Sequence, residues 1–180
     1  MVYVLLADGF EEIEAIAPVD LLRRVDVEVK TVSLTNDLMV RGGHDIVIKA
    51  DITIEQIEFA SLEMLVLPGG LGGVSKIADT PAAMDLILKV WKAEKKLAAI
   101  CAAPKLLAQL GIISGLVVCH PSVKDDVINA GGVILSDRQS AYDNNLITGK
   151  AAGSSIEFAL ELVAVMRDRE TSDKIRNMIS

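Results

Sequence analysis

The sequence predicts a single α/β domain over residues 1–180, with a mostly parallel β-sheet covered by helices on both faces. Short apolar runs alternate with stretches of helical periodicity, which is typical of repeated strand–helix units. Hydrophobic residues make up 51% of the 180 residues and aromatic residues only 3%, so the core must be built from Val, Ile, Leu and Ala. Strands that are buried on both faces have this aliphatic composition. We find no repeat and no linker-like segment that would divide the chain.

Seven apolar runs have the length and composition of strands. They are residues 2–7, 28–34, 64–67, 97–100, 116–119, 132–135 and 145–148. Residues 45–54 also indicate extended chain, because Val47, Lys49 and Asp51 do not keep a helical period. We expect this segment to be an antiparallel excursion.

Helical patterns connect these runs, and a shorter one follows near the C-terminus. The longer ones cover residues 11–24, 82–95, 104–110, 122–130 and 154–169. Pro104 stands in a first helical turn directly after a strand, where proline is favoured. Ser154, Ser155 and Glu157 precede an apolar run and form a partial N-cap signal.

The charge and the ends of the chain exclude several classes of partner. The net charge of −7 argues against nucleic acid and against an anionic membrane surface. No uncharged apolar stretch is long enough for a transmembrane helix, and the first residues resemble a strand rather than a signal peptide. With two cysteines and two histidines, we expect free thiols, no dedicated zinc or iron site, and a cytoplasmic location.

Cys101 stands between a buried strand and a helix, flanked by small residues such as Ala99 and Ala102. In parallel sheets, ligands bind outside the carboxyl ends of the strands. A helix N-terminus lowers the pKa of a thiol, and the backbone N–H of Ala102 could stabilise an oxyanion. The alternative is that Cys101 is a small buried hydrophobic residue.

The loop that begins Pro68-Gly69-Gly70 lies at the carboxyl end of another strand. Its glycines would allow the backbone close to a ligand, and Gly70 could donate a second N–H to an oxyanion. It lacks the pattern of a nucleotide-binding loop, so nucleotide binding is a weak hypothesis. An ordinary tight turn is the alternative.

Glu14 is the only charged residue from Ile13 to Val19. Such a carboxyl group is either solvated at an exposed gap or buried with a raised pKa. Glu11 and Glu12 are interpreted as first-turn acids that the helix dipole favours.

His120 ends the predicted strand 116–119 and could face the same crevice as Cys101, as a general acid or base. A structural histidine is equally compatible with this position. His44 falls in a loop and indicates little by itself, and Cys119 is expected to be a buried strand residue that could pair with Cys101 under oxidation.

Four ordered motifs resemble the DJ-one/ThiJ/PfpI superfamily, and most closely its DJ-one branch. They are Ala-Asp-Gly-Phe-Glu-Glu-Ile-Glu at 7–14, Leu-Pro-Gly-Gly at 67–70, Ala-Ala-Ile-Cys-Ala-Ala-Pro at 98–104 and Gly-Ser-Ser-Ile-Glu-Phe-Ala at 153–159. The resemblance runs nearly end to end. It implies a flavodoxin-like three-layer sandwich, without a cofactor, that forms a homodimer through its first helix.

The resemblance also implies roles for individual residues. Cys101 would be the nucleophile, Glu14 would hydrogen-bond to its sulfur, and Gly70 and Ala102 would supply oxyanion N–H groups, with His120 nearby. Gly69 and His44 could support these residues from outside the reacting centre.

The sequence departs from the family pattern at three places. Ala102 stands where protease-like relatives have a histidine, His44 where several relatives have an arginine, and Ala151-Ala152-Gly153 where relatives often have Gly-Pro-Gly.

We therefore expect a cysteine-dependent, glutathione-independent glyoxalase or deglycase acting on a small reactive carbonyl such as methylglyoxal. The alternative is a redox sensor and oxidation-activated chaperone that uses the same cysteine. A cysteine peptidase or amidase is a remote third possibility, because no histidine follows Cys101.

Overall fold

The computed structural model describes residues 1–180 and contains a seven-stranded sheet in the order β10-β11-β7-β6-β1-β2-β5. All neighbouring strands are parallel except the edge pair β10–β11. The strands are β1 Val2–Leu6, β2 Val29–Ser33, β5 Ile52–Thr53, β6 Met64–Leu67, β7 Lys96–Ile100, β10 Ser140–Asp143 and β11 Leu146–Gly149. The predicted α/β class with a mostly parallel sheet is confirmed.

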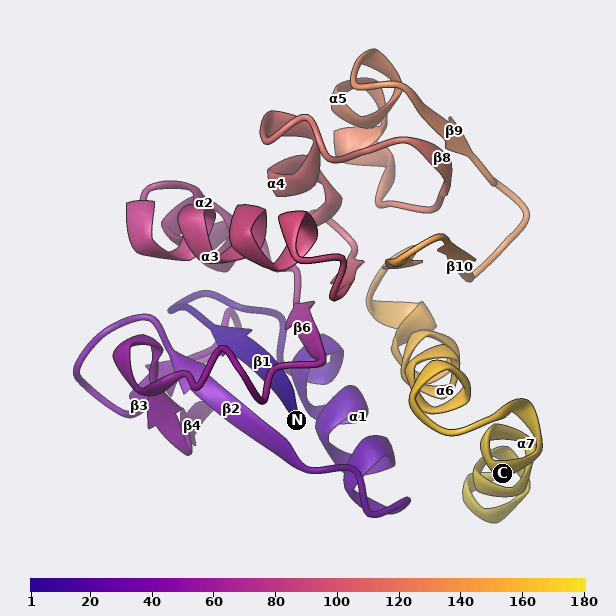
Figure 1. Cartoon of the computed structure of the whole chain (residues 1–180), viewed down its shortest axis with the longest axis horizontal. Coiled ribbons are helices and arrows are strands. Elements are labelled where there is room, and N and C mark those ends of the chain that lie inside the picture. The colour runs from indigo at the N-terminus through magenta and orange to yellow at the C-terminus, as the bar shows by residue number, and fades with distance from the viewer.

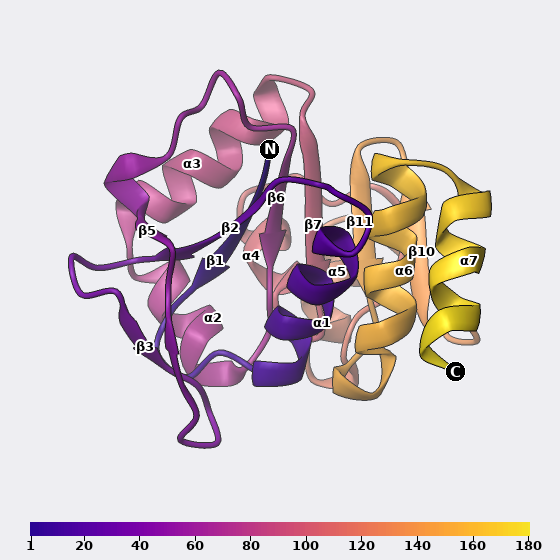
Figure 2. The same cartoon turned by 90° about the horizontal axis from the view of Figure 1, so that it is seen from below.

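Helices cover both faces of this sheet and complete three layers (Figures 1 and 2). One face carries α1 Glu12–Arg23, α6 Ser155–Met166 and α7 Arg169–Ile179. The other face carries α2 Leu71–Ala78, α3 Pro81–Lys92, α4 Pro104–Gln109 and α5 Lys124–Asn129. Three short 3₁₀ turns, η1 Ile54–Gln56, η2 Pro121–Val123 and η3 Ala152–Ser154, lie between these elements.

The alternation of side chains along the central strands divides the core into two apolar clusters. Leu65 and Leu67 of β6 face the cluster under α2–α5, whereas Met64 and Val66 face the cluster under α1 and α6. Successive strand residues point to opposite faces, so strands that supply both clusters must be apolar throughout. The continuous apolar runs in the sequence have this origin.

The segments predicted as strands 116–119 and 132–135 lie outside the main sheet. They are shorter, β8 Gly115–Val117 and β9 Gly132–Ile134, and pair in parallel only with each other. Leu116 and Val133 are exposed on the outer face of this small sheet. An apolar run thus indicated a strand, but it did not indicate which sheet the strand joins.

The predicted antiparallel excursion at residues 45–54 is confirmed in part: β4 Val47–Lys49 pairs antiparallel with β3 Met39–Arg41, but Ile52 and Thr53 do not belong to this hairpin. The chain then returns to the main sheet as β5. The sequence prediction missed β3 and the edge strand β10, because both are short and partly exposed.

The sequence prediction also missed α2, which begins directly after Gly70 and contains Gly72 and Gly73. These residues have poor helix propensity. The predicted helix 154–169 is α6, which ends slightly earlier, at Met166. The predicted shorter helix near the C-terminus is α7, which begins where the side chain of Asp168 accepts a hydrogen bond from the backbone N–H of Thr171. The predicted helix 122–130 begins as the 3₁₀ turn η2 and continues as α5. None of the helices is long and apolar enough to cross a membrane.

Candidate active site

Cys101 follows β7 in a sharp turn with φ = +65°. A positive φ costs a non-glycine residue of order 1–3 kcal/mol and persists only where the surroundings enforce it. Here the Cys101 N–H donates to the Gly149 carbonyl of β11 at 2.9 Å, and the Cys101 carbonyl accepts from the N–H of His120 at 2.8 Å. The half-buried cysteine is therefore clamped from two sides. The helix α4 begins only at Pro104, so a short turn separates the thiol from the helix.

Glu14 projects from α1 and is completely buried. Its Oε2 accepts a hydrogen bond from the backbone N–H of Gly69 at 2.8 Å, and its Oε1 has no hydrogen-bond partner. Burial raises the pKa of Glu14 to about 7, an effect that the hydrogen bonds from Cys101 and Gly69 only partly offset. The buried alternative predicted for Glu14 is confirmed, and the solvated one is wrong.

The loop at Gly69 and Gly70 brings Glu14 and Cys101 together. A Cβ atom on Gly69 would lie 2.5 Å from Glu14 Oε2 and 2.8 Å from Cys101 Cβ, so no side chain fits between them. Gly70 has φ = +89°, and a Cβ there would lie 2.4 Å from the Gly9 carbonyl oxygen. The loop is thus more than an ordinary tight turn.

The pKa of Cys101 contradicts the expected low value. Burial raises it to about 12, and the charge and hydrogen bond of Glu14 raise it further, whereas the N–H groups of Ala102 and Gly70 lower it. These two N–H groups are the ones predicted to stabilise an oxyanion, and both form hydrogen bonds that favour the ionised sulfur. At neutral pH the sulfur therefore keeps its proton, and Glu14, with a pKa of about 7, is divided between its carboxylic acid and carboxylate forms. A carboxylate beside a neutral thiol has the arrangement of a general base and its nucleophile.

His120 is tied to Cys101 through its backbone N–H. Its ring is held locally: Nδ1 lies 2.8 Å from Ser122 Oγ and accepts the Ser122 backbone N–H at 3.2 Å. In the neutral imidazole, the proton is therefore on Nε2. The side chain is half-buried, and no hydrogen bond joins its ring to the sulfur.

Glu12 is a first-turn acid of α1, as the sequence indicated, but it also has a specific partner. It is buried, and its Oε1 accepts the backbone N–H of His44 at 2.7 Å while its Oε2 lies 2.9 Å from His44 Nδ1. The hydrogen bond to Glu12 raises the pKa of His44, and the charge of Glu11 raises it further. Sequence reasoning missed Glu12 because its partner lies 32 residues away.

Glu11, Glu12 and His44 place one ligand-type atom each within 4.8 Å of one another, the spacing that a metal ion could use. The hydrogen bonds between Glu12 and His44 already account for this arrangement. Cys119 is buried beyond the end of β8, and both cysteines are free thiols.

Comparison with known proteins identifies relatives of the whole chain. The model of the DJ-1/PfpI family matches residues 1–165. Protein dj-1beta of Drosophila melanogaster is 33% identical over 96% of this chain and 92% of its own. The crystal structure of Drosophila DJ-1beta covers 99% of this chain and 96% of its own, at 31% identity and a TM-score of 0.93.

Two further relatives have names that state an activity. The glutathione-independent glyoxalase DJR-1.2 of Caenorhabditis elegans is 30% identical over 86% of this chain and 91% of its own. A deglycase of Pyrococcus abyssi is 29% identical over 92% of this chain and 99% of its own.

Proposed function

The chain belongs to the DJ-1/PfpI family, and from that premise we propose that it is a cysteine-dependent, glutathione-independent glyoxalase or deglycase acting on 2-oxoaldehydes such as methylglyoxal. The observation that carries the proposal is the buried Glu14 carboxyl held against Cys101 by the Gly69 loop. The names of the nematode and archaeal relatives favour the same two activities.

In the first step, the Cys101 sulfur attacks the aldehyde carbon and transfers its proton to the Glu14 carboxylate. The carbonyl π bond breaks, and the new alkoxide is stabilised by the N–H groups of Gly70 and Ala102. Glu14 returns its proton to this oxygen, which gives a hemithioacetal and restores the carboxylate. The raised pKa of Glu14, about 7, makes this carboxylate a stronger base than an ordinary glutamate.

In the following steps, Glu14 moves a proton from the former aldehyde carbon to the neighbouring carbon, and the hydroxyl proton of the hemithioacetal passes to the oxygen of the neighbouring carbonyl group. These transfers convert the hemithioacetal into a thioester of a 2-hydroxy acid without a net change in oxidation state. Water then cleaves the thioester, returns the thiol of Cys101 and releases the acid, which is lactate when methylglyoxal is the substrate. Glu14 accepts the proton of this water, and we assign to His120 the donation of a proton to the thioester oxygen, because its Nε2 carries the proton.

The direct test is lactate formation from methylglyoxal without glutathione. We expect Cys101→Ser to abolish the reaction and Cys119→Ser to leave it unchanged. Deglycase activity is distinguished by following the release of an amine from an early glycation adduct after free methylglyoxal has been removed. The proposal fails if the wild-type protein catalyses neither reaction above the Cys101→Ser background.

The same site supports oxidation of Cys101 as a second candidate function. The unpartnered Glu14 Oε1, once protonated, and the two oxyanion N–H groups could donate hydrogen bonds to sulfinate oxygens. One solved relative, from Toxoplasma gondii, is described as oxidised DJ-1. Intact mass after mild peroxide treatment should show two added oxygens confined to Cys101, and scattered oxidation would contradict this role.

We also propose a homodimer through α1, because Ile13 and Ile16 are 52% and 42% exposed on one face of this helix. Light scattering should give twice the chain mass for the wild type and a smaller mass for Ile16→Glu. A wild-type monomer would contradict the proposal.

A further inference from the structure

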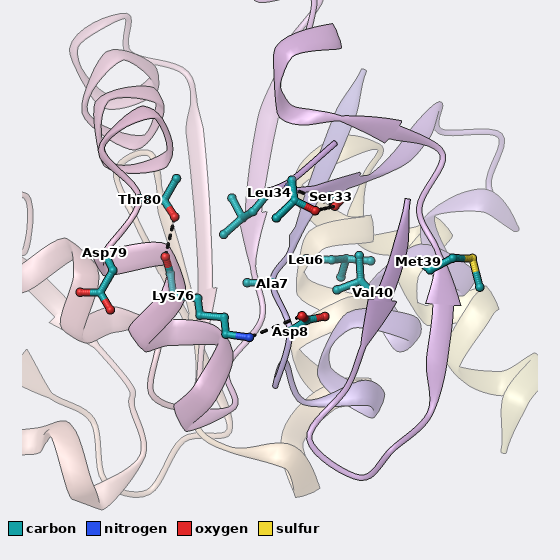
Figure 3. A pocket seen from close by; sticks show the side chains of 11 residues that line it. Leu6, Ala7, Asp8, Ser33, Leu34, Met39, Val40, Lys76, Asp79 and Thr80 are labelled. Carbon is teal, nitrogen blue, oxygen red and sulfur yellow. Dashed lines mark hydrogen bonds and ion pairs between the residues drawn. The ribbon is translucent and has the colours of Figure 1, made fainter. Parts of the chain in front are cut away.

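A cavity with a volume of about 290 Å³ lies at the carboxyl ends of β1 and β2, apart from the site at Cys101 (Figure 3). It is enclosed by the ends of these strands, by β3 and by the C-terminal part of α2. Neither Cys101 nor Glu14 lines it. Gly9, which packs against Gly72 and Gly73, lies between this cavity and the Gly70 loop. Open α/β sheets bind ligands at this edge, so the cavity has the position of a ligand site.

The cavity contains two opposite charges side by side. Lys76 Nζ lies 3.4 Å from Asp8 Oδ2, and the two side chains are 56% and 54% exposed. Asp8 Oδ1 accepts the backbone N–H of Arg41 at 2.8 Å, and this hydrogen bond lowers the pKa of Asp8, so the carboxylate stays ionised and fixed. A long and exposed ion pair stabilises the fold by less than about 1 kcal/mol. A ligand can therefore separate Lys76 from Asp8 at little cost.

The wall opposite Lys76 is aliphatic. Leu34 and Met39 line it with side chains that are at least partly exposed, whereas Leu6 and Val40 are buried beneath them. The nearby hydroxyl groups are already engaged, because Ser33 Oγ donates to the Asp37 carbonyl at 2.6 Å and Thr80 Oγ1 to the Lys76 carbonyl at 2.7 Å. A second carboxylate, that of Asp79, also lines the cavity but points away from Lys76 (Figure 3). Recognition in this cavity therefore rests on Lys76, Asp8 and an apolar wall.

We propose that this cavity binds a free aliphatic α-amino acid. Its carboxylate would pair with Lys76, its ammonium group with Asp8, and its side chain would contact Leu34 and Met39. An α-amino acid carries its two charges on one carbon, which matches the adjacent pair in the protein. A simple carboxylate would meet repulsion from Asp8, and a simple amine would meet repulsion from Lys76. The volume lies near the lower limit for ligand pockets, which favours a ligand of this size over a nucleotide.

The first test is a titration of the ¹⁵N-labelled protein with L-leucine, followed by NMR. We expect saturable shifts of the backbone amides of Ala7, Leu34 and Lys76. Isocaproate and isoamylamine are leucine without its amino group and without its carboxylate, and each should bind at least about tenfold more weakly. Absence of saturable shifts, or equal binding of either analogue, would overturn the proposal.

The second test uses variants that remove one charge each. Lys76→Met and Asp8→Asn should each weaken leucine binding at least about tenfold, and Asn can still accept the Arg41 N–H that holds the β3 strand. Lys105→Met is the matched control, because Lys105 is also a partly exposed lysine paired with an aspartate, Asp126, but lies outside the cavity. The spectra of the free variants report whether they fold. Unchanged binding in a folded Lys76→Met protein would refute the assignment.

Discussion

Glu12 and Glu14 stand two residues apart at the start of α1, and both are buried, yet the pKa of Glu12 is lowered and that of Glu14 is raised to about 7. Burial acts to raise both values. Glu12 receives two hydrogen bonds from His44, whereas Glu14 faces a neutral thiol and leaves one oxygen unpartnered. The hydrogen-bond partners of a buried carboxyl group, more than its burial, therefore decide whether its pKa is lowered, as in Glu12, or raised, as in Glu14.

The largest effect is expected when the Glu14 carboxylate is removed and the rate of the proposed reaction is measured. Glu14→Gln should reduce kcat/KM for methylglyoxal between about 100-fold and 10,000-fold, the range that general bases contribute. In the wild type, kcat/KM should rise as the pH increases through about 7, because the carboxylate form accepts the thiol proton.

Glu12→Gln is the matched control for this measurement. We expect it to change kcat/KM less than about tenfold, because Glu12 bonds to His44 and not to the sulfur. A Glu14→Gln enzyme that kept the wild-type rate and pH profile would exclude Glu14 as the base.

The second effect is on the free energy of unfolding. The contribution of Glu14 to this free energy should decrease as the pH rises. Its folded pKa of about 7 exceeds its ordinary value of 4.5, so its contribution is complete below pH 4.5 and is lost as the pH rises to about 7. The loss is at most about 3 kcal/mol. Urea unfolding of the wild type and Glu14→Gln at pH 5 and pH 8 should show the variant gaining relative stability at pH 8. A difference that does not depend on pH would contradict the raised pKa.

A smaller effect of the opposite sign is expected for Glu12. Its folded pKa is lowered, so its contribution is present above pH 4.5 and is lost as the pH falls through the folded value. Glu12→Gln should lower the free energy of unfolding at pH 7 by about 1–2 kcal/mol. Near pH 3, the wild type and Glu12→Gln should have the same free energy of unfolding. A remaining difference at that pH would refute the pairing of Glu12 with His44.

The smallest effect is expected for His44, whose side chain is 70% exposed. Glu12 raises its pKa above the ordinary value of 6.5, so its contribution is present below pH 6.5 and is lost as the pH rises through the folded value. His44→Gln should therefore lower the melting temperature slightly at pH 6 and not at pH 9. A larger effect at pH 9 would show that the imidazole acts in its neutral form.

Much of the site could be predicted from the sequence because it lies in short local motifs. Gly69, Gly70, Cys101 and Ala102 occupy strand ends, and parallel strands bring their carboxyl ends to one edge. Glu14 was identifiable as a lone charge in an apolar helix segment.

What could not be predicted depends on contacts between distant segments. The partner of Glu12 comes from the loop after β3, and the pKa of Cys101 depends on how deeply the folded chain buries it. Likewise, the run at Leu116 has strand composition, but only the folded chain shows that it pairs with β9. Local pattern thus indicates which residues react, and tertiary packing sets how they ionise.

The clamp on Cys101 has a consequence for the synthesis of the chain. Its backbone is fixed by Gly149 and His120, and Glu14 comes from the first helix. During synthesis, a chain that ends before residue 149 therefore lacks the acceptor for the Cys101 N–H. The turn at Cys101 is complete only when the chain has been translated and folded as far as Gly149.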